Sequence, residues 1–138
     1  MLLPCEVAVK SLLPPVRAAL AKQLMTKHGL KQVEAAKILG LSQPAISLYH
    51  RRRRGKALNL ESEEEIRKLI EELANALASK SLSRKEFILK FCAICKTARA
   101  KGLLCQTHKA LDKAFDTEKC ELCMSTRLEC LNQEPLNT

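Results

Sequence analysis

Apolar residues recur three or four positions apart in several stretches of the chain, which is the spacing of a helix that buries one face. In the first stretch, Pro14 and Pro15 can open a helix, because proline fits the first turn. Gly29 is placed to stop that helix at about Lys27. The pattern predicts further helices, whose ranges are 32–39, 43–51 and 62–79, with another from Ser83 through Phe91.

The predicted helix over 62–79 has the longest apolar stripe. Ser62 and Glu65 form a capping-box pattern at its start, and Ser83 and Glu86 repeat that pattern at the next helix. The stripe must bury against something, either the core of the N-terminal half or the same helix of a second subunit. We favour the second subunit, which predicts a homodimer.

Composition agrees with a helical chain. Of the 138 residues, 46% are hydrophobic and only 3% are aromatic. The apolar residues are mostly Leu, Ala and Ile, whereas a sheet favours β-branched and aromatic residues. We therefore expect an all-α fold.

The charge is one-sided. Residues 1–60 hold 11 of the 24 Lys and Arg but only 2 of the 15 acidic residues, which accounts for the whole net charge of +9. A basic surface attracts polyanions, and phosphate contacts supply most non-specific affinity for nucleic acid.

Residues 29–55 lie inside this basic half and fit a helix-turn-helix. Gly40 permits the positive φ of a tight turn, Ala36 allows close helix packing, and Ser42 is a suitable N-cap. The second helix would then enter the major groove with its N-terminal residues. The predicted DNA-contacting residues are Gln32, Ser42, Gln43, Pro44, Ser47, Arg51, Arg52, Arg53 and Arg54.

This segment resembles the helix-turn-helix of the Cro and phage-repressor superfamily of regulators, the XRE family. The shared residues are Gln32, Ala36, Gly40, Ser42, Gln43, Ile46, Ser47 and Tyr49. More broadly, the chain resembles small archaeal regulators with an LPCE-like start and a cysteine-rich tail. The resemblance implies DNA contacts at Gln32, Gln43 and Ser47, and binding as a dimer.

The C-terminal half carries paired cysteines with the spacing C-x2-C-x9-C-x2-H-x11-C-x2-C. Two residues between thiolates let one metal ion bind both from a tight turn. The first choice of ligands is Cys92, Cys95, Cys120 and Cys123, and the runner-up replaces one pair with Cys105 and His108. Two ions are also compatible with these six residues, whereas Cys5 and Cys130 are interpreted as lone, unligated thiols.

Zinc is favoured, because paired cysteines with a histidine are typical of zinc sites. A [4Fe–4S] cluster is the alternative, since it also takes four thiolates. The cluster would make the protein a redox or iron sensor, and a zinc module could instead recruit a protein partner. No catalytic nucleophile–base set or Gly-rich phosphate loop stands out, so an enzyme is not expected.

These features divide the chain into a DNA-binding domain over 1–60, a connecting or dimerisation helix over 61–82, a metal module over 83–130 and a disordered tail over 131–138. The apolar start lacks the pattern of a secretory signal. No apolar run approaches the roughly 18 residues of a membrane span. We expect a regulator of double-stranded DNA that is cytoplasmic and nucleoid-associated, with no membrane association.

Overall fold

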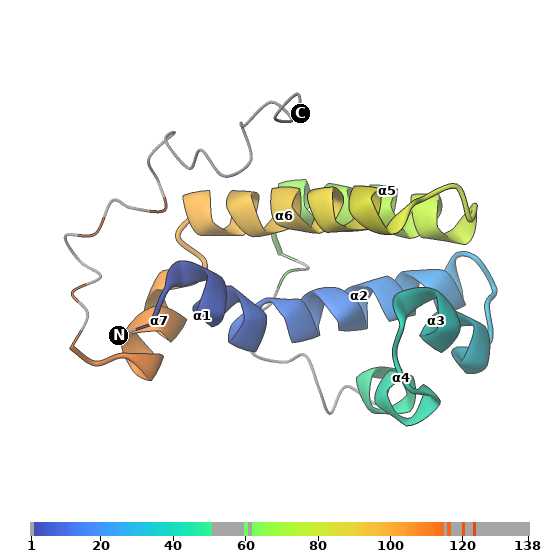
Figure 1. The fold of residues 1–138 in the computed structure, drawn as a ribbon, viewed down its shortest axis with the longest axis horizontal. Helices are drawn as coiled ribbons and strands as arrows, with labels where there is room; N and C mark the ends of the chain where they lie inside the picture. Colours follow the sequence, from blue (N-terminus) through green and yellow to red (C-terminus); the bar gives the residue numbers. More distant parts are fainter. Residues whose placement is uncertain are drawn as a thin grey trace, which may run out of the picture.

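The computed structural model describes residues 2–50 and 62–114, together with residues 60, 116, 120 and 123. Within these residues the chain is helical throughout and contains no strand, which confirms the expected all-α fold (Figure 1). The described helices are α1 (Pro4–Ser11), α2 (Leu13–Thr26), α3 (Gln32–Leu39), α4 (Gln43–His50), α5 (Glu64–Ala78), α6 (Arg84–Ala100) and α7 (Cys105–Leu111). The predicted tail over 131–138 lies outside the described residues.

Helix α1 was not predicted from the sequence. Pro4 occupies its first turn, and the Leu3 backbone N–H donates to the Glu6 carboxylate at 2.6 Å, which helps to cap it. Val7 and Ala8 face inward and are buried. An isolated helix this short would be marginal in water, so packing on the rest of the chain stabilises it.

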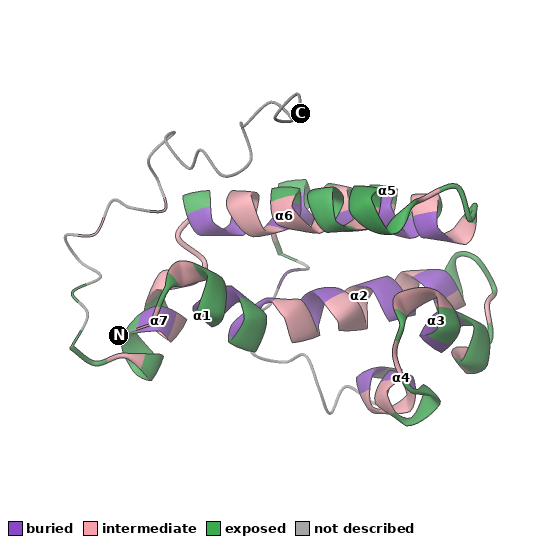
Figure 2. Cartoon of the chain, viewed as in Figure 1, coloured by how far each residue is buried: buried purple, intermediate pink, exposed green. Residues whose placement is uncertain are grey.

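Helix α2 lies at the centre of the fold and contacts α1, α3, α4 and α5. Helices α5 and α6 run side by side across it, and α7 packs at the far end against α1 (Figure 1). Figure 2 shows the buried residues on the facing sides of these layers. The largest fully buried side chains of the main core are those of Val7, Leu12, Val16, Leu20, Leu24, Ile66, Leu73 and Ile94.

The apolar stripe of α5 is buried within the chain. Ile66, Ile70, Leu73 and Leu77 all belong to the main core, because α5 packs between α2 and α6. The prediction that this stripe forms a dimer interface is therefore wrong, and the alternative of core packing is correct. Any dimer must use another surface.

The two predicted capping boxes have different outcomes. At α6 the Glu86 backbone N–H donates to Ser83 Oγ at 3.1 Å, and the Ser83 N–H donates to the Glu86 carboxylate at 2.7 Å, so this box is confirmed. At α5 the N-cap is Glu63 rather than Ser62, and the Glu63 side chain makes no capping hydrogen bond. Exposed Lys101 instead ties the end of α6 to the start of α5, through Glu65 at 3.2 Å and Glu63 at 3.8 Å.

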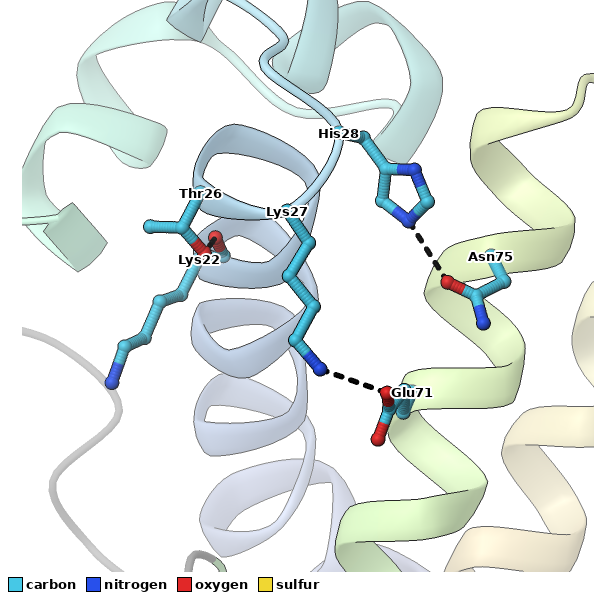
Figure 3. A network of polar contacts seen from close by, with 6 residues as sticks. All are labelled: Lys22, Thr26, Lys27, His28, Glu71 and Asn75. Carbon is cyan, nitrogen blue, oxygen red and sulfur yellow. Dashed lines mark hydrogen bonds and ion pairs between the residues drawn. The ribbon is translucent and has the colours of Figure 1, made fainter.

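Polar contacts also join the end of α2 to the middle of α5 (Figure 3). Lys27 Nζ lies 2.8 Å from the Glu71 carboxylate, and His28 Nε2 lies 2.9 Å from Asn75 Oδ1. The hydrogen bond and charge of Lys27 lower the pKa of Glu71. Both pairs are exposed, so they orient the helices more than they stabilise the fold.

No helix in the described part of the chain is long and apolar enough to cross a membrane.

Burial of Leu73 gives a test of the core. Leu73 is 0% exposed, so Leu73→Ala should lower the free energy of unfolding by about 2–5 kcal/mol, because apolar packing is removed and a cavity remains. The matched control is Val9→Ala on α1, where Val9 is 59% exposed and the expected change is within about 0.5 kcal/mol. Urea denaturation measures both. Similar effects at the two positions would contradict the packing of α5 between α2 and α6.

Candidate nucleic-acid interface and candidate metal site

Helices α3 and α4 are joined by a tight turn at Gly40. Gly40 adopts φ 66°, and the Leu41 backbone N–H donates to the Ala36 carbonyl at 2.9 Å, which closes the C-terminus of α3. Ser42 then caps α4, because its Oγ accepts a hydrogen bond from the Ala45 backbone N–H at 3.2 Å. The predicted positive φ of Gly40 and the predicted N-cap role of Ser42 are confirmed.

A second, small core holds α3 and α4 against α2. Its buried members are Ala21, Ala36, Ile46 and Tyr49, from three different helices. The small alanines let the helix backbones approach, while Ile46 and Tyr49 fill the space between them. This core fixes which side of α4 faces outward.

The outward side of α4 is polar. Ser42, Gln43 and Pro44 are exposed, and Ser47 is half-exposed. Gln43 Nε2 donates to Oε1 of Gln32 at 2.8 Å, which links the first residue of α4 to the first residue of α3. Four of the predicted DNA-contacting positions thus lie at the N-terminal ends of two neighbouring helices, and Ser47 lies one turn further along α4.

Other features of this segment differ from what its sequence predicts, or they concern residues that the structure does not describe. Val33, which follows Gln32 in α3, is apolar but is 66% exposed. The predicted helix over 43–51 ends at His50 in the described part of the chain. Arg51, Arg52, Arg53 and Arg54 lie outside the described residues, and exposed Lys31 and Lys37 are the described cations of α3 and its N-cap.

The first cysteine pair lies in the middle of α6, not in the tight turn that its spacing suggested. Cys92 and Cys95 are three residues apart in the helix, so their side chains share one face. Both are half-exposed, and neither forms a disulfide. The helical pair can still present two thiols to one ion.

The second pair, Cys105 and His108, lies on α7. His108 is buried, and its Nε2 donates to the Leu2 carbonyl at 3.1 Å. The Leu2 backbone N–H donates in turn to the Asp112 carboxylate at 3.1 Å. His108 therefore anchors the N-terminal segment, and its Nε2 is engaged rather than available to a metal.

Arg99 connects these segments electrostatically. Burial alone would lower its pKa, but a hydrogen bond with Cys123 and the charges of Cys123, Cys95 and Cys5 raise the pKa instead. Burial raises the pKa of Cys95, and the charge of Arg99 opposes that effect. Burial and then the charges of Cys123 and Cys120 raise the pKa of Cys105.

The described residues do not form a closed metal site, since no three of their His, Cys, Asp and Glu side chains are grouped as metal ligands. Thiols from three segments, those of Cys5, Cys95 and Cys123, act instead on one buried guanidinium, that of Arg99. Cys5 is one of these thiols, although the sequence around Cys5 has no feature that distinguishes it from the other lone cysteine, Cys130. A motif defined by the spacing between neighbouring cysteines cannot relate Cys5 to cysteines that lie far from it along the chain.

The raised pKa of Cys95 predicts slow alkylation of the metal-free protein. At pH 7 the protonated thiol predominates, so iodoacetamide should modify Cys95 more slowly than exposed Cys5, and the Cys95 rate should rise as pH increases toward the raised pKa. Peptide mass spectrometry after timed quenching measures each site. Faster modification of Cys95 than of Cys5 at pH 7 would contradict its burial.

Comparison with known proteins does not assign the chain to a family: no family model, no curated protein and no solved structure matches it. Its function must therefore come from its own residues and contacts.

Proposed function

We propose that the protein is a sequence-specific regulator of transcription that binds double-stranded DNA through a helix-turn-helix formed by α3 and α4. The hydrogen bond between Gln32 and Gln43 is the observation that carries this proposal. It holds an exposed polar side chain at the N-terminal end of α4, the part of a recognition helix that reads bases. An ordinary packing helix has no need of such an arrangement on its exposed side.

The chemistry of Gln43 suits adenine. One N–H of its amide donates to Gln32, which leaves the second N–H and the carbonyl oxygen for another partner. Adenine offers the complementary pair in the major groove, an acceptor at N7 and a donor at N6. Gln32 would orient this amide, since the hydrogen bond fixes which way the side chain points.

The neighbouring residues fit supporting roles. The Ser47 hydroxyl, one turn along α4, can bond a base or a phosphate, and exposed Ser42 and Pro44 border the groove. Lys31 and Lys37 are exposed near the two ends of α3 and suit backbone phosphates. The four arginines after α4 would extend the phosphate contacts.

Regulators of this kind bind paired half-sites as dimers, so we propose a homodimer on an imperfect palindrome. The buried stripe of α5 is not available for this contact. Ile88 and Leu89 on α6 are each 53% exposed and offer an apolar surface for a second copy. A cytoplasmic, nucleoid-associated location follows from this role.

We further propose that the cysteine module holds a metal, with zinc favoured and a [4Fe–4S] cluster as the alternative. The thiols around buried Arg99 support a site built from thiolates. A structural zinc would stabilise a module too small to fold well on its own core, or present it to a protein partner. A cluster would make DNA binding respond to iron or oxidants.

Replacement of Gln43 tests the base readout. Gln43→Ala should cost about 1–3 kcal/mol on a duplex enriched from a random pool, and it should relax the preference at one position of each half-site. Gln106→Ala is the matched control, because Gln106 is an exposed glutamine on α7. Fluorescence anisotropy with single-base variants of the duplex measures both. An unchanged base preference would remove Gln43 from the interface.

Neutralising Arg51, Arg52, Arg53 and Arg54 to glutamine tests the phosphate contacts. All duplexes should bind more weakly, and the slope of log affinity against log salt should flatten by up to about 0.9 for each phosphate that the variant no longer neutralises. The control neutralises three exposed cations of α6, Arg84, Lys85 and Lys90. If the control flattens the slope and the arginine variant does not, the DNA interface lies elsewhere.

A further inference from the structure

Arg99 lies near the C-terminal end of α6 and has unused hydrogen-bonding capacity. The residue is only 7% exposed, and its Nε has no hydrogen-bond partner. Within the described ranges no ion pair joins Arg99 to a carboxylate. A buried guanidinium is costly unless anions and hydrogen bonds compensate it. An anionic oxygen placed beside Arg99 would therefore lower the cost of its burial.

Cys5 of α1 faces this guanidinium. Arg99 Nη1 lies 4.0 Å from Cys5 Sγ, which allows only a weak contact, because a thiol is a poor acceptor. Among the described cysteines Cys5 alone is exposed, and it forms no disulfide, so a small reagent can reach its sulfur. Cys5 also lies in the first turn of α1, where the helix dipole favours negative charge. Exposure beside a positive charge is typical of cysteines that react as nucleophiles.

From this geometry we propose that Cys5 is a site of reversible oxidation, and that Arg99 holds the oxidised side chain as a sulfenate anion. The Cys5 thiolate attacks the terminal oxygen of a hydroperoxide, so that a sulfur–oxygen bond forms while the oxygen–oxygen bond breaks. The departing oxygen takes up the proton that the thiol released and leaves as water or an alcohol. Sulfur is oxidised by two electrons, and the peroxide is reduced by two. The sulfenic acid then loses its proton to solvent as it pairs with Arg99.

The gap between Cys5 and Arg99 suits one added oxygen atom. Nη1 and Sγ are 4.0 Å apart, whereas an N–H···O hydrogen bond spans about 2.7–3.2 Å between heavy atoms. An oxygen bonded to Sγ on the side of Arg99 would come closer to Nη1 than the sulfur is now, and so reach that range. The bond would be charge-assisted, which makes it roughly twice as strong as one between neutral groups. Because Cys5 is exposed, the oxygen needs no cavity.

Oxidation would add a link between α1 and α6. Leu2 already ties the N-terminal segment to α7, through hydrogen bonds with His108 and Asp112. A sulfenate at Cys5 would tie the following turn of the chain to Arg99. A charge-assisted hydrogen bond that exists only in the folded protein stabilises it, so the oxidised protein should resist unfolding better. The step requires neither a metal ion nor DNA, and its test is independent of both.

Trapping of the sulfenic acid tests the site. The reduced full-length protein, Arg99→Gln and the control Arg84→Gln receive a brief pulse of hydrogen peroxide, which catalase then removes. Dimedone, which labels sulfenic acids, is added after increasing delays, and peptide mass spectrometry reports the label at each cysteine. Cys5 should be labelled before the half-exposed Cys95, and its sulfenate should persist about tenfold longer than in Arg99→Gln. Arg84 is exposed on the same helix, so Arg84→Gln should match the unmodified protein.

Urea denaturation supplies a readout that does not depend on the folding of Arg99→Gln. Peroxide treatment should lower the equilibrium constant for unfolding of the unmodified protein by about tenfold, and a thiol reductant should reverse the change. Cys5→Ser, treated in parallel, should show no such gain, and it corrects for oxidation of methionine. Label that reaches Cys95 before Cys5, an equal sulfenate lifetime in folded Arg99→Gln, or no gain in stability beyond that of Cys5→Ser would each overturn the proposal.

Discussion

The apolar surface of α2 determines the arrangement of the rest of the molecule. One side of α2 buries Leu20 and Leu24 against α5, and the other places Ala21 against Ile46 and Tyr49 of α4. The same helix therefore supports the candidate DNA-contacting helices and the layer that carries the cysteines. Side chains of this core interlock at high density, so a shift of α2 would be felt by both candidate sites.

Local signals in the sequence predicted most of the helices and the turn between α3 and α4. Gly40 adopts the positive φ, and Ser42 and Ser83 form the caps, that these residue types favour. The short helices α1 and α7 were missed because they pack on each other and on the rest of the chain, and local propensity does not report tertiary packing. The choice between dimer and core for the stripe of α5 likewise needed the three-dimensional arrangement, since both uses require the same pattern.

The candidate sites also contain some features that the sequence predicted and others that depend on the three-dimensional arrangement. The polar face of α4 followed from the sequence, because helix geometry fixes which residues share a side. The hydrogen bond between Gln32 and Gln43, and the exposure of Val33, depend on how α3 and α4 cross. The spacing of the cysteines identified the pairs, but it predicted a tight turn for the first pair, which lies in helix α6. The buried guanidinium of Arg99 and the approach of Cys5 arise from contacts between distant segments.

The N-terminal ends of α3 and α4 are where we propose that DNA binds. Amide hydrogen exchange of the unmodified protein, with and without a duplex enriched from a random pool, tests this most directly. We expect the duplex to slow exchange around Gln32 and from Ser42 to Ser47, where few competing contacts shield the backbone. The exchange of α6 residues such as Phe87 should stay unchanged. Protection confined to α5 and α6, or no protection at all, would contradict the proposed interface.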